Sequence, residues 1–189
     1  MKFERKNITI TSAEDSLWYP VRTVARHEIR LYQYLNNNNI PSYLPVVANV
    51  KVHQVSYKEK TFRYEDNVLR PMLKSYVFAQ LNDEQKRAIW RSNSVQTILN
   101  VTREQQPSFI EELRGLQMIE ELALSSRVEY KKEIQVADRF CIEAPRQFEG
   151  VFGYLVERRK RFLWVIKLEI FGSYILAEID PREYRFNKV

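Results

Sequence analysis

The stretch Leu69–Leu81, with the sequence LRPMLKSYVFAQL, is the key to the fold of this chain. From Ser75 onward its β-branched and aromatic residues follow one another without a breaker, which predicts a β-strand. Alternate side chains of a strand point to opposite faces. One face is small and aliphatic, as is typical beneath a helix: Ser75, Val77, Ala79 and Leu81. The other face is aromatic and also needs a cover: Tyr76, Phe78 and Gln80, with Met72 and Leu73 leading in.

The segments around this strand predict a small α+β domain. Their expected order is strand 16–23, helix 25–39, strand 40–55, exposed hairpin or loop 56–70, the strand above, helix 82–93 and strand 94–101. The run Asn36–Asn39 should end the first helix, because asparagine favours caps over helix interiors. In the second helix, Asp83 is the expected N-cap, with Ile89 and Trp90 on the buried side. We expect a mainly antiparallel sheet with both helices on one face and the aromatic face open.

The second half predicts a long helix and then a small β domain. A polar linker precedes a helix over 107–126, in which Ser108 and Glu111 are spaced as a capping box. This helix is expected to pack on a domain as a connector, with partner binding as the alternative. From Ile134, short alternating strands and three of the four glycines favour an SH3-like β-barrel. The expected divisions are a flexible extension (1–15), the α+β domain (16–105), a linker helix (106–130) and the barrel (131–189).

The excess of positive charge lies in the first half of the chain. Residues 1–106 carry 16 Lys and Arg against 10 Asp and Glu, whereas residues 107–189 carry 14 against 14. A basic surface points to a polyanion such as nucleic acid, with a mere aid to solubility as the alternative. No apolar run is long enough to span a membrane, and the N-terminus lacks the apolar core of a secretory signal. We therefore expect a cytoplasmic protein without membrane contact, acting as a monomer.

Residues for catalysis or metal binding are scarce. His27 and His53 are the only histidines and Cys141 is the only cysteine, too few for a metal site, a catalytic dyad or an internal disulfide. No phosphate-binding or nucleophile-elbow pattern is present. The acid pairs Glu111/Glu112 and Glu120/Glu121 fall on a helix that we expect to be solvated. The sequence indicates a binding protein rather than an enzyme, with no cofactor and no metal.

Five segments of the first half resemble, in order, the N-terminal domain of the NusG family of transcription elongation factors: WYPVRT, a helix containing ARHE, IPSYLP, LRPMLKSYVFAQL and SVQTILNV. Residues 138–180 are similar to the KOW domain that ends those proteins, with FEG (148–150) at its turn. Residues 73–76 stand where the family commonly has Phe-Pro-Gly-Tyr. This departure makes the chain more similar to specialised members, above all the UpxY-type regulators of capsular polysaccharide operons, and also RfaH.

The resemblance implies a non-enzymatic role at RNA polymerase. In the family, the open face of the N-terminal domain holds the clamp helices of the largest catalytic polymerase subunit. Carried over by position, the expected polymerase-binding residues are Tyr76, Phe78, Leu73, Pro71, Tyr19 and Ile98. The alternative is that they pack beneath the chain's own linker helix or barrel, and both hold if the barrel masks the site until recruitment. A factor that binds the elongating state better than paused states suppresses pausing and termination, for example in polysaccharide biosynthesis operons.

Two basic clusters are the expected contacts to nucleic acid or further partners. Around the first helix these are Arg22, Arg26, His27 and Arg30, with Arg26 and Arg30 as an i, i+4 stripe toward non-template DNA or nascent RNA. At a barrel hairpin they are Arg158, Arg159, Lys160 and Arg161, toward RNA, the ribosomal small subunit or another factor. Weaker candidates in the long hairpin are Lys51, Lys58, Lys60 and Arg63. A solvated helix face and a solvated turn are the alternatives, and the competing function is an RNA- or ribosome-binding module acting through the barrel.

Overall fold

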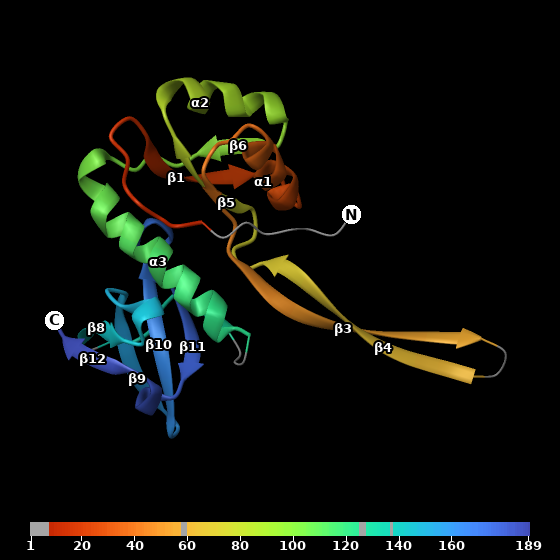
Figure 1. Ribbon diagram of the computed structural model, residues 1–189, viewed down its shortest axis with the longest axis vertical. Coiled ribbons are helices and arrows are strands. Elements are labelled where there is room, and N and C mark those ends of the chain that lie inside the picture. Colours follow the sequence, from red (N-terminus) through yellow and green to blue (C-terminus); the bar gives the residue numbers. More distant parts are fainter. Residues whose placement is uncertain (1–7, 58–59, 125–127, 137) are drawn as a thin grey trace.

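The computed structural model describes residues 8–57, 60–124, 128–136 and 138–189, with the backbone alone at 49–57 and 60–68. The chain forms two β units joined by a helix, and a long hairpin projects from the first unit (Figure 1). The first unit combines an antiparallel sheet with helices, and the second is a six-stranded antiparallel sheet. This architecture confirms the predicted α+β class. No helix among the described residues is long and apolar enough to cross a membrane.

The N-terminal sheet has four strands in the order β2-β5-β1-β6. They are β1 (Leu17–Thr23), β2 (Ser42–Tyr43), β5 (Tyr76–Leu81) and β6 (Val95–Ile98). Two α-helices, α1 (Glu28–Asn37) and α2 (Asp83–Ala88), and the 3-10 turn η1 (Ile89–Ser92) accompany this sheet. β5 forms where the sequence predicts it and lies between β2 and β1. The residues at 77–79, in the middle of this strand, have no exposed surface.

The register between β1 and β5 assigns side chains to the two faces of the sheet. Tyr19 pairs with Ala79, and the next pair along is Pro20 with Phe78. Because neighbouring pairs point to opposite sides, Tyr19 lies on the face opposite to Phe78. Lys86 of α2 places its Nζ 4.2 Å from the centre of the Tyr19 ring. The Tyr19 face is therefore the one beneath the helices, and Phe78 belongs to the other.

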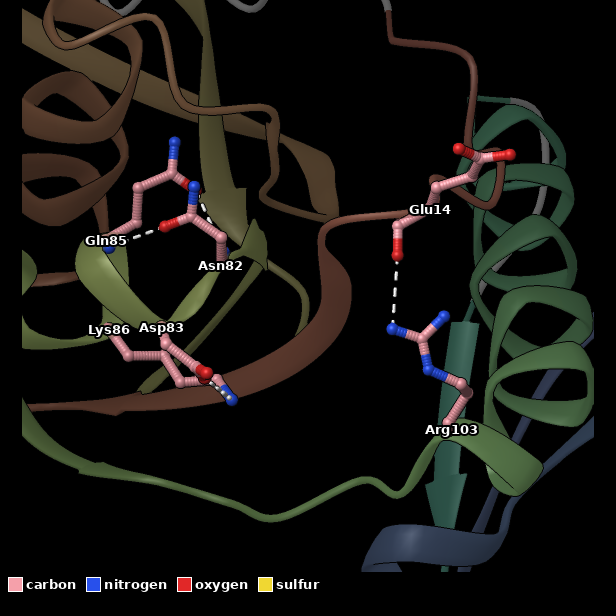
Figure 2. A network of polar contacts seen from close by, with 6 residues as sticks. All are labelled: Glu14, Asn82, Asp83, Gln85, Lys86 and Arg103. Atoms are coloured by element: carbon pink, nitrogen blue, oxygen red, sulfur yellow. Dashed lines mark hydrogen bonds and ion pairs between the residues drawn. The ribbon is translucent and has the colours of Figure 1, made fainter.

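The start of α2 is set by a capping box one residue earlier than predicted. The Asn82 side chain accepts a hydrogen bond from the Gln85 N–H at 2.8 Å, and the Gln85 side chain accepts one from the Asn82 N–H at 3.0 Å (Figure 2). Asp83, the predicted cap, instead pairs with Lys86 at 3.2 Å. Trp90, predicted to be buried, is 47% exposed, because the chain has already changed from α2 to the tighter turn η1.

The first helix begins later than the predicted residue 25. Arg26 has a φ of 66°, in the left-handed region, which no α-helix accommodates, and α1 begins at Glu28. The asparagine run ends the helix as predicted. The last helical residue is Asn37, and Asn39 turns the chain away with a φ of 55°.

A two-stranded hairpin projects from the N-terminal unit (Figure 1). Its strands, β3 (Val46–Tyr57) and β4 (Lys60–Pro71), pair in one unbroken register. The predicted strand over 40–55 is divided into β2 and β3, with Pro45 between them, and the predicted hairpin or loop over 56–70 is mostly the second strand. The four basic hairpin candidates fall at positions whose side chains lie outside the described part of the structure.

The helix between the two units is α3 (Gln106–Leu122), and it contacts both of them (Figure 1). It follows the 3-10 turn η2 (Arg103–Gln105), whose capping box is formed by Thr102 and Gln105. The predicted box of Ser108 and Glu111 is wrong, because the helix is already under way at these residues. The helix ends at Leu122, four residues before the predicted end at 126 and within the linker division of 106–130.

The C-terminal β domain (128–189) has the strand order β12-β8-β9-β10-β11-β7. Its strands are β7 (Val128–Lys131), β8 (Arg139–Ala144), β9 (Phe152–Arg158), β10 (Arg161–Leu168), β11 (Ser173–Ile179) and β12 (Arg185–Lys188), with 3-10 turns η3 (Arg146–Phe148), η4 (Glu169–Phe171) and η5 (Pro181–Glu183). The predicted boundary at 131 is late, because β7 pairs with β11. Trp164 is fully buried, and a Cβ at Gly153 would lie 2.6 Å from its ring, so this position requires glycine.

Residues 8–15 are held against the fold, contrary to the predicted flexible extension. Ile10 is only 1% exposed, and its carbonyl accepts a hydrogen bond from Arg114 of α3 at 3.1 Å. Arg103 donates to the carbonyl of Glu14 at 3.1 Å (Figure 2). These bonds use backbone carbonyls, which any sequence supplies, so the pattern of side chains gives no sign of them. Residues 1–7 of the predicted extension lie outside the described residues.

Candidate functional site

Tyr76 and Phe78 of β5 form the aromatic face, and the structure covers it from two sides. Phe78 is fully buried, with its ring centre 6.1 Å from that of Tyr43 and 5.9 Å from that of Phe109 on α3. Phe171 of η4, in the C-terminal β domain, packs edge-on at 4.6 Å from Tyr76 and 6.4 Å from Phe78. The face expected to be open therefore lies beneath both the linker helix and the β domain, as the alternative interpretation holds.

The other four residues predicted for this surface divide into two pairs. Leu73 is buried in the turn before β5, and Pro71 ends β4 next to that turn. Tyr19 lies beneath α2, and Ile98 pairs with Val21, two residues along the same face of β1. Tyr19 and Ile98 therefore cannot line the aromatic face, and their assignment to it is wrong. Position in the chain suggests them, but the alternation of the strand sends both side chains to the helix side.

Buried polar side chains fix α3 to the N-terminal unit. The Gln106 amide accepts a hydrogen bond from the Trp18 N–H and donates one to the Trp18 carbonyl, both at 2.9 Å. Near the other end, Glu120 accepts hydrogen bonds from the Tyr43 hydroxyl at 2.9 Å and the Val46 N–H at 2.8 Å. Glu120 is 4% exposed, so the prediction that it is solvated is wrong. Hydrogen bonds near both ends thus tie α3 to the N-terminal unit, while the helix also packs on β9, β10 and β11 of the β domain.

The C-terminal β domain docks on the other side of α3. Gly115 lets the helix approach β10 so closely that a Cβ there would lie 2.8 Å from Cδ1 of Ile166. The carboxylate of Glu111 pairs with Arg139 of β8 at 2.8 Å across the same boundary, but both side chains remain partly exposed. Such an exposed pair contributes little stability. The docking therefore rests on close packing, on the Phe171 contacts and on one further residue, Glu112.

Among the described residues at this boundary, Glu112 stands out by the strongly perturbed pKa of its carboxyl group. Burial is the main cause that raises the pKa of Glu112 to about 7. The nearby carboxylates of Glu169 and Glu111 act in the same direction, whereas a hydrogen bond from the Glu169 backbone and the charge of Lys167 act against it. Its Oε2 is buried and has no hydrogen-bond partner in the described part of the chain. Helical periodicity alone predicts a solvated position for Glu112, because the periodicity does not show where the β domain docks.

The basic residues predicted around the first helix do not form one stripe. Arg26 lies outside α1, so its i, i+4 relation to Arg30 is not helical and that part of the prediction is wrong. Arg30 is exposed on α1, and Arg22 is exposed on β1, on the side of the aromatic face by register. His27 lies at the N-cap of α1, with Nδ1 3.3 Å from the hydroxyl of Ser94. Of these four residues, Arg22 is the one that pairs directly with Tyr76 of the aromatic face.

The predicted basic tip, residues 158–161, is the turn between β9 and β10. Arg159 and Lys160 have φ values of 53° and 63°, as a two-residue hairpin turn requires. Three arginines of this tip border an open cavity of about 500 Å³ with Leu163 in its wall. Arg161 pairs with Glu178 at 3.3 Å, whereas Arg158 and Arg159 have no ion-pair partner among the described residues. Two cations are therefore available at the rim of a partly apolar cavity.

Comparison with protein families gives a match to the N-terminal part of the chain. Within the part of the chain that the structure describes, no three His, Cys, Asp or Glu side chains gather as a metal site would require. The family model described as "Transcription termination factor nusG" matches residues 16–118, more than half of the chain. The match includes the N-terminal sheet, the hairpin and most of α3, and it ends before the C-terminal β domain. No curated protein sequence matches the chain at a significant level.

Proposed function

This chain belongs to the NusG family of transcription factors, and we propose that it binds RNA polymerase through its aromatic face and thereby suppresses pausing and termination. Members of this family act in transcription elongation and antitermination and are not enzymes. The clamp helices of the largest catalytic subunit are the proposed partner. Binding that is tighter to the elongating than to the paused polymerase shifts the equilibrium toward elongation. The proposed setting is operon-specific, as in polysaccharide biosynthesis operons.

The observation that carries this proposal is the contact of Phe171 with Tyr76. An aromatic side chain of the C-terminal β domain covers an aromatic face that belongs to the N-terminal unit. Because α3 is bonded to the N-terminal unit at both ends, the removable part of the cover is the β domain. When this domain leaves, Tyr76 becomes accessible beside Arg22. Exposed aromatic rings with a polar rim supply most of the energy of many protein interfaces.

The test is binding to a reconstituted polymerase elongation complex, with Phe171→Ser beside the wild type. Two aromatic contacts are lost, each worth about 0.5–1.5 kcal/mol, so the docked state should weaken by roughly 5- to 150-fold. If the docked chain is not competent to bind, the apparent affinity for polymerase rises by up to that factor. An affinity that is unchanged or lower would contradict masking.

A second substitution then tests the face itself. Tyr76→Ala added to Phe171→Ser should remove the gain in affinity, because the ring proposed to contact polymerase is gone. Trp90→Ala in the same background is the matched control, since Trp90 is an exposed aromatic residue on η1, next to the helices. Phe78 is unsuitable for substitution because it is fully buried among core rings. Equal loss with Trp90→Ala, or none with Tyr76→Ala, would remove Tyr76 from the site.

The cavity at the basic tip supports a second proposed contact, with single-stranded RNA. Arginines beside an apolar wall suit phosphate contacts and base stacking. Arg158→Ala/Arg159→Ala should lower the affinity of the intact chain for an RNA oligonucleotide and reduce its salt dependence. Arg146→Ala, an exposed arginine of η3, is the control. If the double variant binds RNA as the wild type does, the tip is a solvated turn.

A further inference from the structure

Glu112 occupies a special position at the boundary between α3 and the C-terminal β domain. It points from α3 toward η4, where the backbone N–H of Glu169 donates a hydrogen bond to its carboxyl group. The same turn, η4, carries Phe171, whose ring covers the aromatic face. A change in the strength of the bond between Glu112 and Glu169 therefore affects the position of Phe171, two residues along the same turn.

We propose that Glu112 controls how tightly the C-terminal β domain covers the aromatic face: the neutral carboxylic acid holds the domain on α3, and the carboxylate loosens it. The consequence for polymerase rests on the function proposed above, because only a masked binding face makes the strength of docking matter. The docking equilibrium itself does not depend on polymerase.

The geometry gives the ionised form no adequate partner. Oε2 of Glu112 is buried and meets no donor in the described part of the chain. Two cavities, of about 140 Å³ and about 450 Å³, adjoin it, and Glu112, Glu169 and Ser108 line both of them. A buried carboxylate with one hydrogen bond is poorly stabilised, whereas a carboxylic acid in the same place has no charge to desolvate.

The charged groups around Glu112 do not compensate for its burial. On α3, Glu111 is a neighbouring carboxylate that pairs with Arg139 of β8 at 2.8 Å. On the β domain, Lys167 of β10 pairs with Glu169 of η4 at 2.6 Å. Both cations that line the smaller cavity are therefore already bound to another acid, and the other titratable residue in its lining is Tyr154 of β9. None of the four described elements that pack here, β8, β9, β10 and η4, therefore supplies a free cation to pair with the Glu112 carboxylate.

The direction of the pH effect follows from the proton affinity of Glu112 in the two states. In the docked chain, burial raises the pKa of Glu112 to about 7, from an ordinary value of 4.5. In the undocked chain its side of α3 faces water, and the ordinary value applies. Docking is then strongest below pH 4.5, weakens as the pH rises toward 7, and stays at the weaker level above it. The full change in the docking equilibrium equals the ratio of the proton affinities in the two states, on the order of 10²-fold.

This arrangement keeps the cover reversible near neutral pH. There the carboxylate form prevails once the β domain has left, and re-docking must either bury the charge or take up a proton. A glutamine at this position would remove the charge and hold the cover in place. The β domain of the natural sequence is thus docked less firmly than its packing alone would allow.

The direct test is the titration of Glu112 in the intact chain, followed by the carboxyl carbon resonances of glutamate-labelled protein. Glu112→Gln identifies the resonance by its absence. We expect Glu112 to titrate near pH 7 in the wild type and to move toward 4.5 in Gly115→Ala/Phe171→Ser, which weakens docking at two other places. A wild-type titration near 4.5 would overturn the proposal.

A second measurement follows docking itself by energy transfer between dyes on the two units. Cysteines replace the exposed residues Asn38 and Asn187 in a Cys141→Ser, Phe171→Ser chain, in which docking is weak enough to vary. The docked fraction should fall from pH 4.5 to pH 7 with Glu112, and should be independent of pH over this range with Glu112→Gln. Glu121→Gln, an exposed acid on the same helix, should keep the pH dependence. A pH dependence that persists in Glu112→Gln would refute the role of this residue. No polymerase is present, so failure here is distinct from failure of the proposed function.

Discussion

Replacing Gly115 with alanine should loosen the C-terminal β domain while leaving both units folded. The added Cβ would lie 2.8 Å from Cδ1 of Ile166 and 3.0 Å from its Cγ1 and Cγ2, well inside ordinary contact distance. Ile166 is β-branched and buried in β10, so it cannot rotate away freely. Relief comes instead from a separation of α3 and β10, which also withdraws Phe171 from the aromatic face.

The expected magnitude combines two effects that act on different equilibria. Overpacking of this kind costs about 1–3 kcal/mol, which corresponds to a 5- to 150-fold weaker docking. Alanine also stabilises a helix by about 1 kcal/mol relative to glycine. This gain is present whether or not the domain is docked, because α3 belongs to the N-terminal unit in both states. It raises the stability of that unit and does not offset the loss of docking.

The assay is energy transfer between dyes on the two units through a urea titration, in a Cys141→Ser chain labelled at positions 38 and 187. Gly115→Ala should separate the domains at a lower urea concentration than the wild type. Adding Ile166→Val, which removes the nearest atom, should restore part of the difference. Glu121→Ala, at an exposed position of the same helix, is the control. Unchanged separation in Gly115→Ala, or a double variant that separates even earlier, would refute the steric explanation.

Two further substitutions test the parts that hold each unit together. Glu120→Ala removes the acceptor of the buried Val46 N–H and the bond that Glu120 accepts from the Tyr43 hydroxyl. The N-terminal unit should therefore lose about 2–4 kcal/mol of unfolding free energy, measured by thermal denaturation against Glu121→Ala. A loss equal to that of the control would mean that α3 is held by packing alone. Gly153→Ala should destabilise the β domain by about 1–3 kcal/mol, because the added Cβ would lie 2.6 Å from the Trp164 ring. Indole fluorescence in a denaturant titration measures this loss. Undiminished stability would show that Trp164 has room to move.

The strand at the centre of the N-terminal sheet was predictable because its sequence carries two independent signals. Closely spaced aromatic and β-branched residues specify a strand, and the difference between its faces specifies which side receives helices. Residues 76–81 form that strand, and the small residues lie on the helix side. The succession of strands in the second half was predictable for the same reason, since alternating apolar residues and glycine turns are local features.

What covers the aromatic face was not predictable from local patterns. In the sequence, the alternating apolar pattern of β10 extends through Ile170. In the structure, Phe171 lies in the 3-10 turn η4, which places its ring over the aromatic face. Glu112 and Glu120 stand in acid pairs that helical periodicity assigns to water, yet Oε2 of Glu112 and the whole Glu120 residue are buried. The available signal was that both faces of the strand around Tyr76 and Phe78 are apolar. Each face must be covered by another part of the chain or by a partner, and the β domain is one such cover.

The assignments of Tyr19 and Ile98 failed for a simpler reason. Both belong to strands of the N-terminal sheet, but their side chains lie on the face opposite to the aromatic one. Once the register of β1 against β5 is known, the parity of the residue number decides the face. Sequence patterns alone do not give the register of non-consecutive strands.

The proposed function depends above all on Tyr76 contacting polymerase once the C-terminal β domain has left. The decisive experiment places a photocrosslinking amino acid at position 76 of the Phe171→Ser chain, bound to an elongation complex, with the same amino acid at position 90 as the control. We expect a crosslink from position 76 to the largest catalytic subunit and none from position 90. A chain that binds the complex but crosslinks from position 90 rather than 76 would show that another surface contacts polymerase.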